Sequence, residues 1–225
     1  MSEKDLNVEL FMFDKPLTSR PGKKYVECLA LSILQCCYKD VYDEFEVCDA
    51  PDIRDRNGIV GIEVTEAITD ADAQIRGEFV KYRLESNREK KERRKQLIED
   101  KGAKVAEGML SYPVIDSQIE ILTIQNAITK KMEKLAEYKK KGFQKLGLFV
   151  FYNDIPIPMK LEHWKARFDE VLCKYTEKYD VIFFGYSCGL IEYNVRQNDI
   201  QVRRIDRSVY NGIKYNTRLK IEKQE

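Results

Sequence analysis

The chain has 225 residues, of which 43% are hydrophobic and 34% are charged, a combination typical of a globular protein with a heavily charged surface. No apolar run approaches the roughly 18 residues of a membrane-spanning helix, and the N-terminus lacks a signal-peptide pattern, so we expect neither a membrane protein nor a secreted one. The formal net charge of +1 excludes an argument for nucleic-acid binding from overall basicity, and such a function has to rest on local patches.

Cysteine and histidine usage argues against a zinc site and against thiol catalysis. The six cysteines form no CxxC pair, and several lie in apolar runs, so we expect reduced core thiols in a cytoplasmic protein. The single His163 has no Cys or His partner at metal-ligand spacing. The sequence also contains no P-loop and no GxSxG elbow, which removes two common enzyme classes.

Residues 21–38 have the periodicity of an amphipathic helix and are followed by a short predicted strand at residues 44–47. Apolar side chains recur at helical spacing and should form the buried face: Val26, Leu29, Ala30, Ile33 and Cys37. Pro21 is compatible with the first turn of this helix.

Residues 52–65 predict a β-hairpin, because Asn57-Gly58 is the strongest short-range signal for a two-residue type I′ turn. That turn places Ile53 opposite Ile62 and Asp52 opposite Glu63. On the second strand, alternation sends Ile62 and its i±2 neighbours to the core and leaves the face of Glu63 open to a ligand.

Two directly opposed carboxylates repel each other, since paired side chains in a hairpin have Cβ atoms only about 4.5–5.5 Å apart. A divalent cation between Asp52 and Glu63 would convert this repulsion into binding, and Mg²⁺ is typically held by one or two carboxylates. The spacing therefore suggests a metal site. The alternative is a surface hairpin whose acids are simply solvated.

Pro51-Asp52 and the strand Ile62-Glu63-Val64, whose glutamate lies 11 positions after the aspartate, resemble the PD-(D/E)xK nuclease superfamily. The resemblance implies an α/β fold with a restriction-endonuclease-like central mixed β-sheet flanked by helices, in a single domain over residues 1–225. Thr65 stands where the family has its lysine. Either the lysine has migrated to another element or the site is degenerate.

The same resemblance suggests a third acid from the first helix, because that helix often supplies one to the metal site in the family. Glu27 is the candidate, sharing a side of the helix with Leu31 and Leu34. The alternative is that Glu27 lies early in the helix only to favour the macrodipole.

A charged helical insertion is predicted at about residues 68–107, where helix-forming residues dominate and basic residues outnumber acidic ones. Arg93 and Arg94 lie within it and are candidate nucleic-acid contacts. The insertion either presents a solvated face or touches DNA phosphates or a partner helix.

Residues 116–141 predict a second long helix with an apolar stripe of Ile121, Ile124, Ile128, Met132 and Leu135. In the resembled superfamily the helix after the acid-bearing strand can donate a glutamine or a migrated lysine. Lys131 at the edge of the stripe and Gln125 are the corresponding candidates. The alternative is that Lys131 only extends over the core.

The remaining pattern predicts a strand at residues 146–152, a helix at 161–179, a strand at 181–184 and a hairpin at 190–205. Arg203 and Arg204 on this hairpin either face substrate phosphates or protect a sheet edge from further pairing.

Taken together, the resemblance implies a metal-dependent phosphodiesterase, an endonuclease that hydrolyses DNA with Mg²⁺ or Mn²⁺, in restriction or phage defence. Asp52 and Glu63 would be catalytic and bind metal with Glu27, while Lys131 and Gln125 would position water and phosphate. A homodimer is implied because duplex cleavage usually needs two active sites. The alternative function is a nuclease-fold protein without catalysis that binds nucleic acid or protein.

Overall fold

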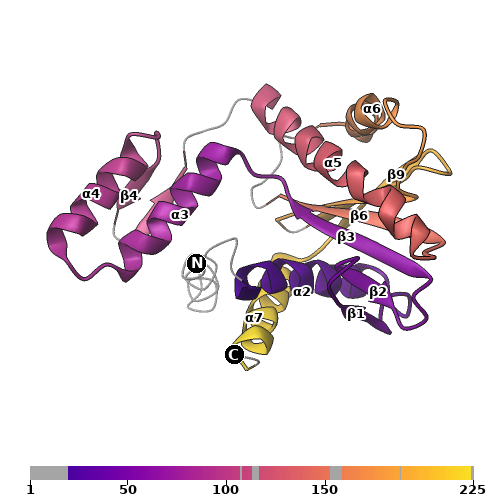
Figure 1. The fold of residues 1–225 in the computed structure, drawn as a ribbon, viewed down its shortest axis with the longest axis horizontal. Coiled ribbons are helices and arrows are strands. Elements are labelled where there is room, and N and C mark those ends of the chain that lie inside the picture. Colours follow the sequence, from indigo (N-terminus) through magenta and orange to yellow (C-terminus); the bar gives the residue numbers. More distant parts are fainter. Residues whose placement is uncertain (1–19, 107, 113–116, 153–158, 188, 224–225) are drawn as a thin grey trace.

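The protein is an α/β fold built on one mixed sheet with helices on both faces, which confirms the predicted α/β class (Figure 1). The computed structural model describes residues 20–106, 108–112, 117–152, 159–187 and 189–223. The strands of the sheet are β1 (Phe45–Val47), β2 (Ile53–Asp55), β3 (Val60–Glu66), β6 (Lys145–Phe151), β7 (Val181–Tyr186), β8 (Gly189–Asn194) and β9 (Asp199–Arg204).

Seven strands lie in the order β1-β2-β3-β6-β7-β8-β9. The strands β3, β6 and β7 are parallel neighbours, whereas β1-β2-β3 and β7-β8-β9 are antiparallel meanders on either side. Because parallel neighbours need a crossover connection, helices must cover the sheet next to β3 and β6.

Two helices cover one face of the sheet: α2 (Arg20–Cys37) and α7 (Arg207–Glu222) (Figure 1). Apolar side chains of α2 pack here with Ile62 and Val64 of β3, as the alternation on that strand predicted. The buried face of α2 is wider than predicted, since Leu31 and Leu34 are buried as well.

The other face is covered by α5 (Ser117–Lys140) and α6 (Leu161–Leu172). Ile124, Ile128, Met132 and Leu135 are buried, which confirms most of the stripe predicted for this helix. They pack on β6 and β7 through Leu148 and the neighbouring side chains.

Two helices differ from the prediction, one in its end and one in its presence. The helix expected to reach residue 179 ends at Leu172, because the chain must return to the start of β7, where Asp180 accepts a hydrogen bond from the Leu146 N–H at 2.7 Å. The helix α7 was not predicted at all, although Asp206 caps it by accepting from the Ser208 N–H.

The hairpin has the predicted register but a different turn. Ile53 pairs with Ile62 and Arg54 with Gly61. Gly58 has a φ of +68°, whereas Asn57 does not lie in the left-handed region, so the turn is not type I′. The carboxylate of Asp55 instead accepts hydrogen bonds from the N–H groups of Ile59 and Val60 and closes a wider loop.

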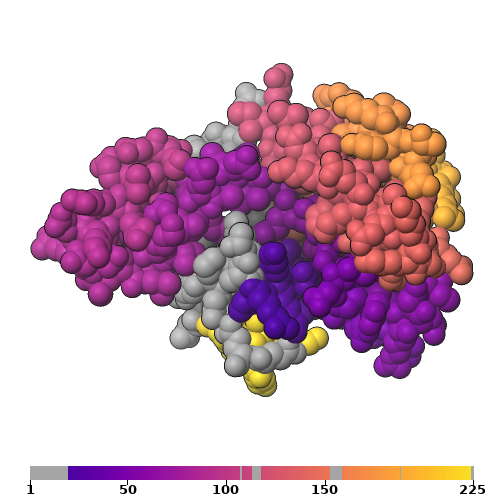
Figure 2. Space-filling model, viewed as in Figure 1, coloured from indigo at the N-terminus to yellow at the C-terminus, as the bar shows by residue number. Residues whose placement is uncertain are grey.

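The insertion forms a separate lobe rather than one long charged helix (Figures 1 and 2). It contains α3 (Asp70–Leu84), α4 (Arg88–Glu99) and a hairpin of β4 (Lys104–Ala106) and β5 (Met109–Ser111). Asn87 begins α4 by accepting from the Lys90 N–H. The lobe buries its own small core, which includes Ile75, Phe79 and Ile98.

No helix in the described part of the chain is long and apolar enough to cross a membrane. The five described cysteines are all free: Cys28, Cys36, Cys37, Cys48 and Cys173.

Replacement of Gly185 should test the tightness of the sheet against the α2 face. A Cβ at this position would lie 2.5 Å from Cζ of Phe149, so we expect Gly185→Ala to lower the free energy of unfolding by about 1–3 kcal/mol. At Gly212 in α7 an added Cβ would have no heavy atom within 4 Å, and Gly212→Ala should stabilise the protein by about 0.5–1 kcal/mol. Urea unfolding of both variants measures the difference, and equal effects would contradict this account of packing.

Candidate functional site

The carboxylate of Glu63 lies at the centre of a buried polar network between β3 and α5. Its side chain is 1% exposed, and Oε1 accepts from the ammonium groups of Lys131 at 2.5 Å and Lys134 at 2.8 Å. The hydroxyl of Tyr138 donates to Oε2. The expectation that the Glu63 face is open to a ligand is therefore wrong, because α5 covers this face.

The three partners of Glu63 come from one side of a single helix. Lys131, Lys134 and Tyr138 are spaced i, i+3 and i+7, which places them on one face of α5. The hydroxyl of Tyr179 donates to the carbonyl oxygen of Lys131 at 2.9 Å and ties the helix to the chain before β7. Lys131 is 19% exposed and Lys134 is 49% exposed, so the network reaches solvent through its lysines.

Glu63 is held in the ionised form. Burial alone would raise the pKa of its carboxyl, but the charge of Lys131 and the hydrogen bonds from Lys131, Lys134 and Tyr138 outweigh burial and lower the pKa. Tyr138 remains a protonated donor, since burial and the hydrogen bond to Glu63 raise the pKa of its hydroxyl.

Asp52 lies beside Glu63 in the segment that leads into β2, next in register after the pair Ile53 and Ile62. Its Oδ2 accepts a hydrogen bond from the Val64 N–H at 2.7 Å. Burial and the negative charge of Glu63 raise the pKa of Asp52 to about 6, against the lowering effects of the Val64 N–H and the lysines. The opposed carboxylates predicted from the hairpin are thus brought together.

Glu27 approaches the same site from α2 and is half-buried. Burial, followed by the charges of Asp52, Asp49 and Glu63, raises the pKa of Glu27 to about 7. Lys131 opposes this effect. The structure therefore brings Glu27, Asp52, Glu63 and Lys131 within electrostatic range of one another, from four separate segments of the chain.

Carboxylate oxygens are the ligands that Mg²⁺ and Mn²⁺ prefer, so Glu27 and Asp52 have suitable donor chemistry for such an ion. Glu63 already uses both oxygens to accept hydrogen bonds and would have to release a partner. Within the described ranges, no three His, Cys, Asp or Glu side chains form a ready-made metal-binding group.

Gln125 does not join this network. Its amide nitrogen donates to the carbonyl oxygen of Arg167 at 3.2 Å and to Oε2 of Glu170 at 3.0 Å, both on α6. Gln125 therefore links the two helices on this face of the sheet, because its side chain points along the α5–α6 interface.

The four arginines considered for nucleic-acid contact lie in two distant places. Arg203 of β9 lies over the ring of Tyr38, with 4.2 Å from its guanidinium carbon to the ring centroid. Arg204, the next residue on β9, is exposed. Arg204 is therefore the more exposed cation of the pair.

Arg93 and Arg94 lie on α4 in the insertion lobe. Arg94 binds Oε2 of Glu78 at 2.9 Å and connects α4 to α3. Arg93 pairs with Glu89 one turn away at 2.9 Å, and both side chains are largely exposed. An exposed pair of this kind is weak, so Arg93 is available to another partner.

Sequence reasoning missed Lys134, Tyr138 and Tyr179. The helical spacing of the first two from Lys131 was visible in the sequence and could have pointed to them, because residues three and seven apart share a helix face. Nothing in the local pattern marks Tyr179, which acts through a contact 48 residues away.

Comparisons with protein-family models, with curated proteins and with solved structures find no match to this chain. The function of this chain therefore has to be inferred from the residues of the site.

The raised pKa of Glu27 predicts how stability depends on pH. Between its ordinary value of 4.5 and about 7, the folded state holds a proton that the unfolded state has released, so the free energy of unfolding should fall as pH rises through this range. The variant Glu27→Gln should lose this contribution and gain stability relative to the wild type on going from pH 5 to pH 8.

Urea unfolding at both pH values measures this difference, with the exposed Glu133→Gln on α5 as the control. The contribution of Glu63 to the pH dependence of stability has the opposite sign. Because the pKa of Glu63 is lowered, its ionised form stabilises the folded state, and this stability is lost only as pH falls below 4.5. A constant difference between Glu27→Gln and the wild type across the range would contradict the charge coupling described for this site.

Proposed function

We propose that the protein is a Mg²⁺- or Mn²⁺-dependent phosphodiesterase that cleaves DNA. The observation that carries this proposal is the meeting of Glu27, Asp52 and Glu63 beside Lys131. The pKa values of Glu27 and Asp52 are raised to about 7 and about 6. Strongly perturbed carboxylates next to a specific cationic partner are typical of functional sites.

The raised pKa values reflect burial first, and then negative charge that the protein itself does not fully neutralise. Burial and mutual repulsion both penalise ionised Glu27 and Asp52. A bound divalent cation would remove this penalty, since its charge favours the ionised form of each carboxylate.

The residues divide into two groups with different tasks. Asp52 and Glu27 would hold the metal ion, which supplies a water of lowered pKa and stabilises charge on the phosphate when bound. Glu63 holds Lys131 in place, and Lys131 supplies a cation for the negative charge that develops on the scissile phosphate. Gln125 has no part in this proposal, because its amide binds α6.

The order of elements supports the same function. The resemblance to the PD-(D/E)xK superfamily implies a helix, a strand, an acid-bearing hairpin, a helix and a strand, and the chain has α2, β1, β2–β3, α5 and β6 in this order around its insertion. A homodimer that presents two sites to the two DNA strands, and a role in restriction or phage defence, are parts of the proposal that follow from this resemblance.

The second candidate is a nuclease-fold protein that binds nucleic acid or protein without catalysis. This function is favoured by the burial of Glu63 under α5, because both carboxylate oxygens of Glu63 already accept hydrogen bonds from that helix. In this function Arg93 and Arg204, which remain accessible, would contact the partner.

The variant Lys131→Ala should distinguish a catalytic role of Lys131 from a purely structural one. We expect it to slow Mg²⁺-dependent cleavage of plasmid and oligonucleotide DNA by about 100-fold or more, since a single group that stabilises transition-state charge has an effect of this size. Lys130→Ala, which removes the exposed neighbour on α5, should leave the rate unchanged. Full activity in Lys131→Ala would show that the lysine only covers the core.

Calorimetric titration with Mn²⁺ addresses the metal site without a known substrate. The wild type should bind the ion, whereas Asp52→Asn should not, with circular dichroism confirming that the variant is folded. If the wild type binds no Mn²⁺ and cleaves no DNA, the binding function replaces the enzymatic one.

A further inference from the structure

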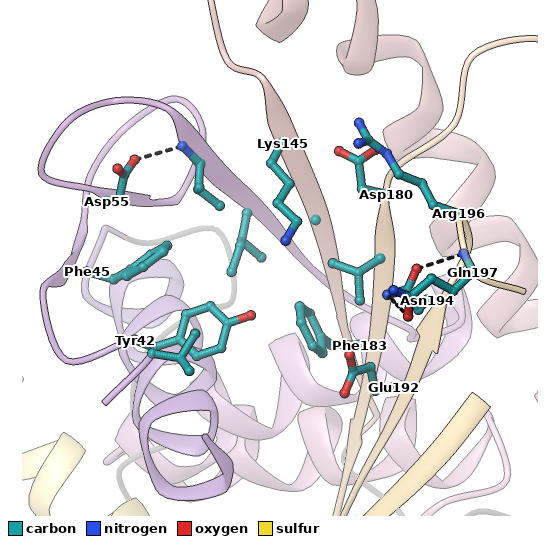
Figure 3. A pocket seen from close by; sticks show the side chains of 15 residues that line it. Tyr42, Phe45, Asp55, Lys145, Asp180, Phe183, Glu192, Asn194, Arg196 and Gln197 are labelled. Atoms are coloured by element: carbon teal, nitrogen blue, oxygen red, sulfur yellow. Dashed lines mark hydrogen bonds and ion pairs between the residues drawn. The ribbon is translucent and has the colours of Figure 1, made fainter. Parts of the chain in front are cut away.

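A second site lies in a cavity of about 490 Å³ on the α2 side of the sheet (Figure 3). It opens where β3, β6 and β7 begin, and Val60, Lys145 and Val181 line it there. None of the residues of the carboxylate–lysine site lines this cavity.

Gly147 of β6 lines the floor of the cavity, between side chains of the two neighbouring strands. Ile62, Gly147 and Val181 are direct neighbours across β3, β6 and β7. A Cβ on Gly147 would lie 3.2 Å from Cγ1 of Val181 and 3.3 Å from Cγ1 of Ile62, so the two flanking side chains pack closely beside the glycine and leave no room for a larger residue there. The helix α2 has already ended at Cys37, and the segment that follows forms the wall instead.

Aromatic rings form this wall and are held in place by one another. The rings of Tyr42 and Phe45 meet edge to face with centroids 4.9 Å apart, and Tyr42 also approaches Phe183 of β7 at 6.3 Å. Figure 3 shows all three facing the cavity. Such a preformed apolar wall can hold a planar ring without first being ordered.

Most charged groups around the cavity are already paired within the protein. Arg196 donates to the carboxylate of Asp180, which also accepts from the Leu146 N–H. Glu192 accepts from the hydroxyl of Tyr38 and the amide of Gln201. These contacts leave Asp180, Arg196 and Glu192 with little capacity for a ligand.

The remaining acid, Asp55, lies at the rim and faces away from the centre of the cavity (Figure 3). Its carboxylate accepts from the backbone N–H groups of Ile59 at 2.8 Å and Val60 at 2.7 Å. Asp55 therefore serves the hairpin loop rather than the interior.

Lys145 is different, because its ammonium group extends into the cavity and has no hydrogen-bond or ion-pair partner among the described residues (Figure 3). The hydroxyl of Tyr42 points toward the same space. Burial and the charge of Glu192 raise the pKa of Tyr42, so this hydroxyl is a protonated donor. Two donors, one of them charged, thus converge next to an aromatic wall.

We propose that this cavity binds a small planar anion, an aromatic or heteroaromatic ring that carries a carboxylate, sulfonate or phosphate group. The ring packs against the wall formed by Tyr42, Phe45 and Phe183, and the anionic group accepts from the ammonium of Lys145 and the hydroxyl of Tyr42. The volume falls within the roughly 300–1,000 Å³ of small-molecule sites. The proposal is independent of nuclease activity.

Two fluorescent probes that differ in charge test this site on the full chain. Anilinonaphthalene sulfonate carries a ring system and an anionic group, whereas phenylnaphthylamine has the rings without the charge. We expect Lys145→Gln to weaken binding of the sulfonate by about tenfold or more, the effect of losing one charged hydrogen bond, and to leave binding of the neutral probe unchanged. The exposed Lys130→Gln is the matched control.

A second variant fills the space without removing the charge. Val60→Trp should abolish binding of both probes, because the larger ring occupies the cavity at the start of β3. The proposal is overturned if Lys145→Gln weakens both probes equally, or if the sulfonate binds with wild-type affinity to Lys145→Gln. Circular dichroism and urea unfolding confirm that each variant is folded.

Discussion

The ion pair between Glu63 and the lysines of α5 is the constraint on which the rest of the structure depends. An ionised carboxylate taken out of water costs several kcal/mol, and the charges and hydrogen bonds of Lys131, Lys134 and Tyr138 are needed to compensate for it. These partners fix both the rotation and the position of α5 over β3. The crossover that makes β3 and β6 parallel neighbours is therefore tied to the same carboxylate that forms the candidate site.

The main elements could be predicted because their apolar spacing is clear. The stripe of α5 and the nearly continuous apolar run of β6 agree with the structure, and the hairpin register follows from the position of Asn57-Gly58. The turn type could not be predicted, because the Asp55 carboxylate accepts hydrogen bonds from the backbone of the loop, which the dipeptide rule ignores. The helix α7 was overlooked although Asp206 and the spacing of Tyr210 and Ile221 are helical signals.

The sequence predicted the acids of the site but not the side chains that surround them. Opposed acids can be found from hairpin register alone, and this is why Asp52 and Glu63 were identified. Whether a face of the sheet is open depends on what covers it, so the burial of Glu63 could not be known before α5 was placed. Gln125 and Lys131 lie on one helix, but Gln125 contacts α6 and Lys131 contacts β3. The periodicity of α5 alone does not tell which neighbouring element each side chain meets.

The number of hydrogen bonds that each carboxylate already accepts indicates where a cation could bind. Glu63 accepts three side-chain donors, whereas Asp52 accepts the Val64 N–H on Oδ2 and its Oδ1 receives no hydrogen bond from the described residues. A cation should therefore approach from the side of Asp52 and Glu27, while Lys131 stays on Glu63. Because the pKa values of Asp52 and Glu27 are about 6 and about 7, a metal ion must displace protons from this pair near neutral pH. Metal binding at this proposed site would thus be coupled to its protonation, and the same repulsion that weakens the folded state at high pH is what a bound cation would relieve.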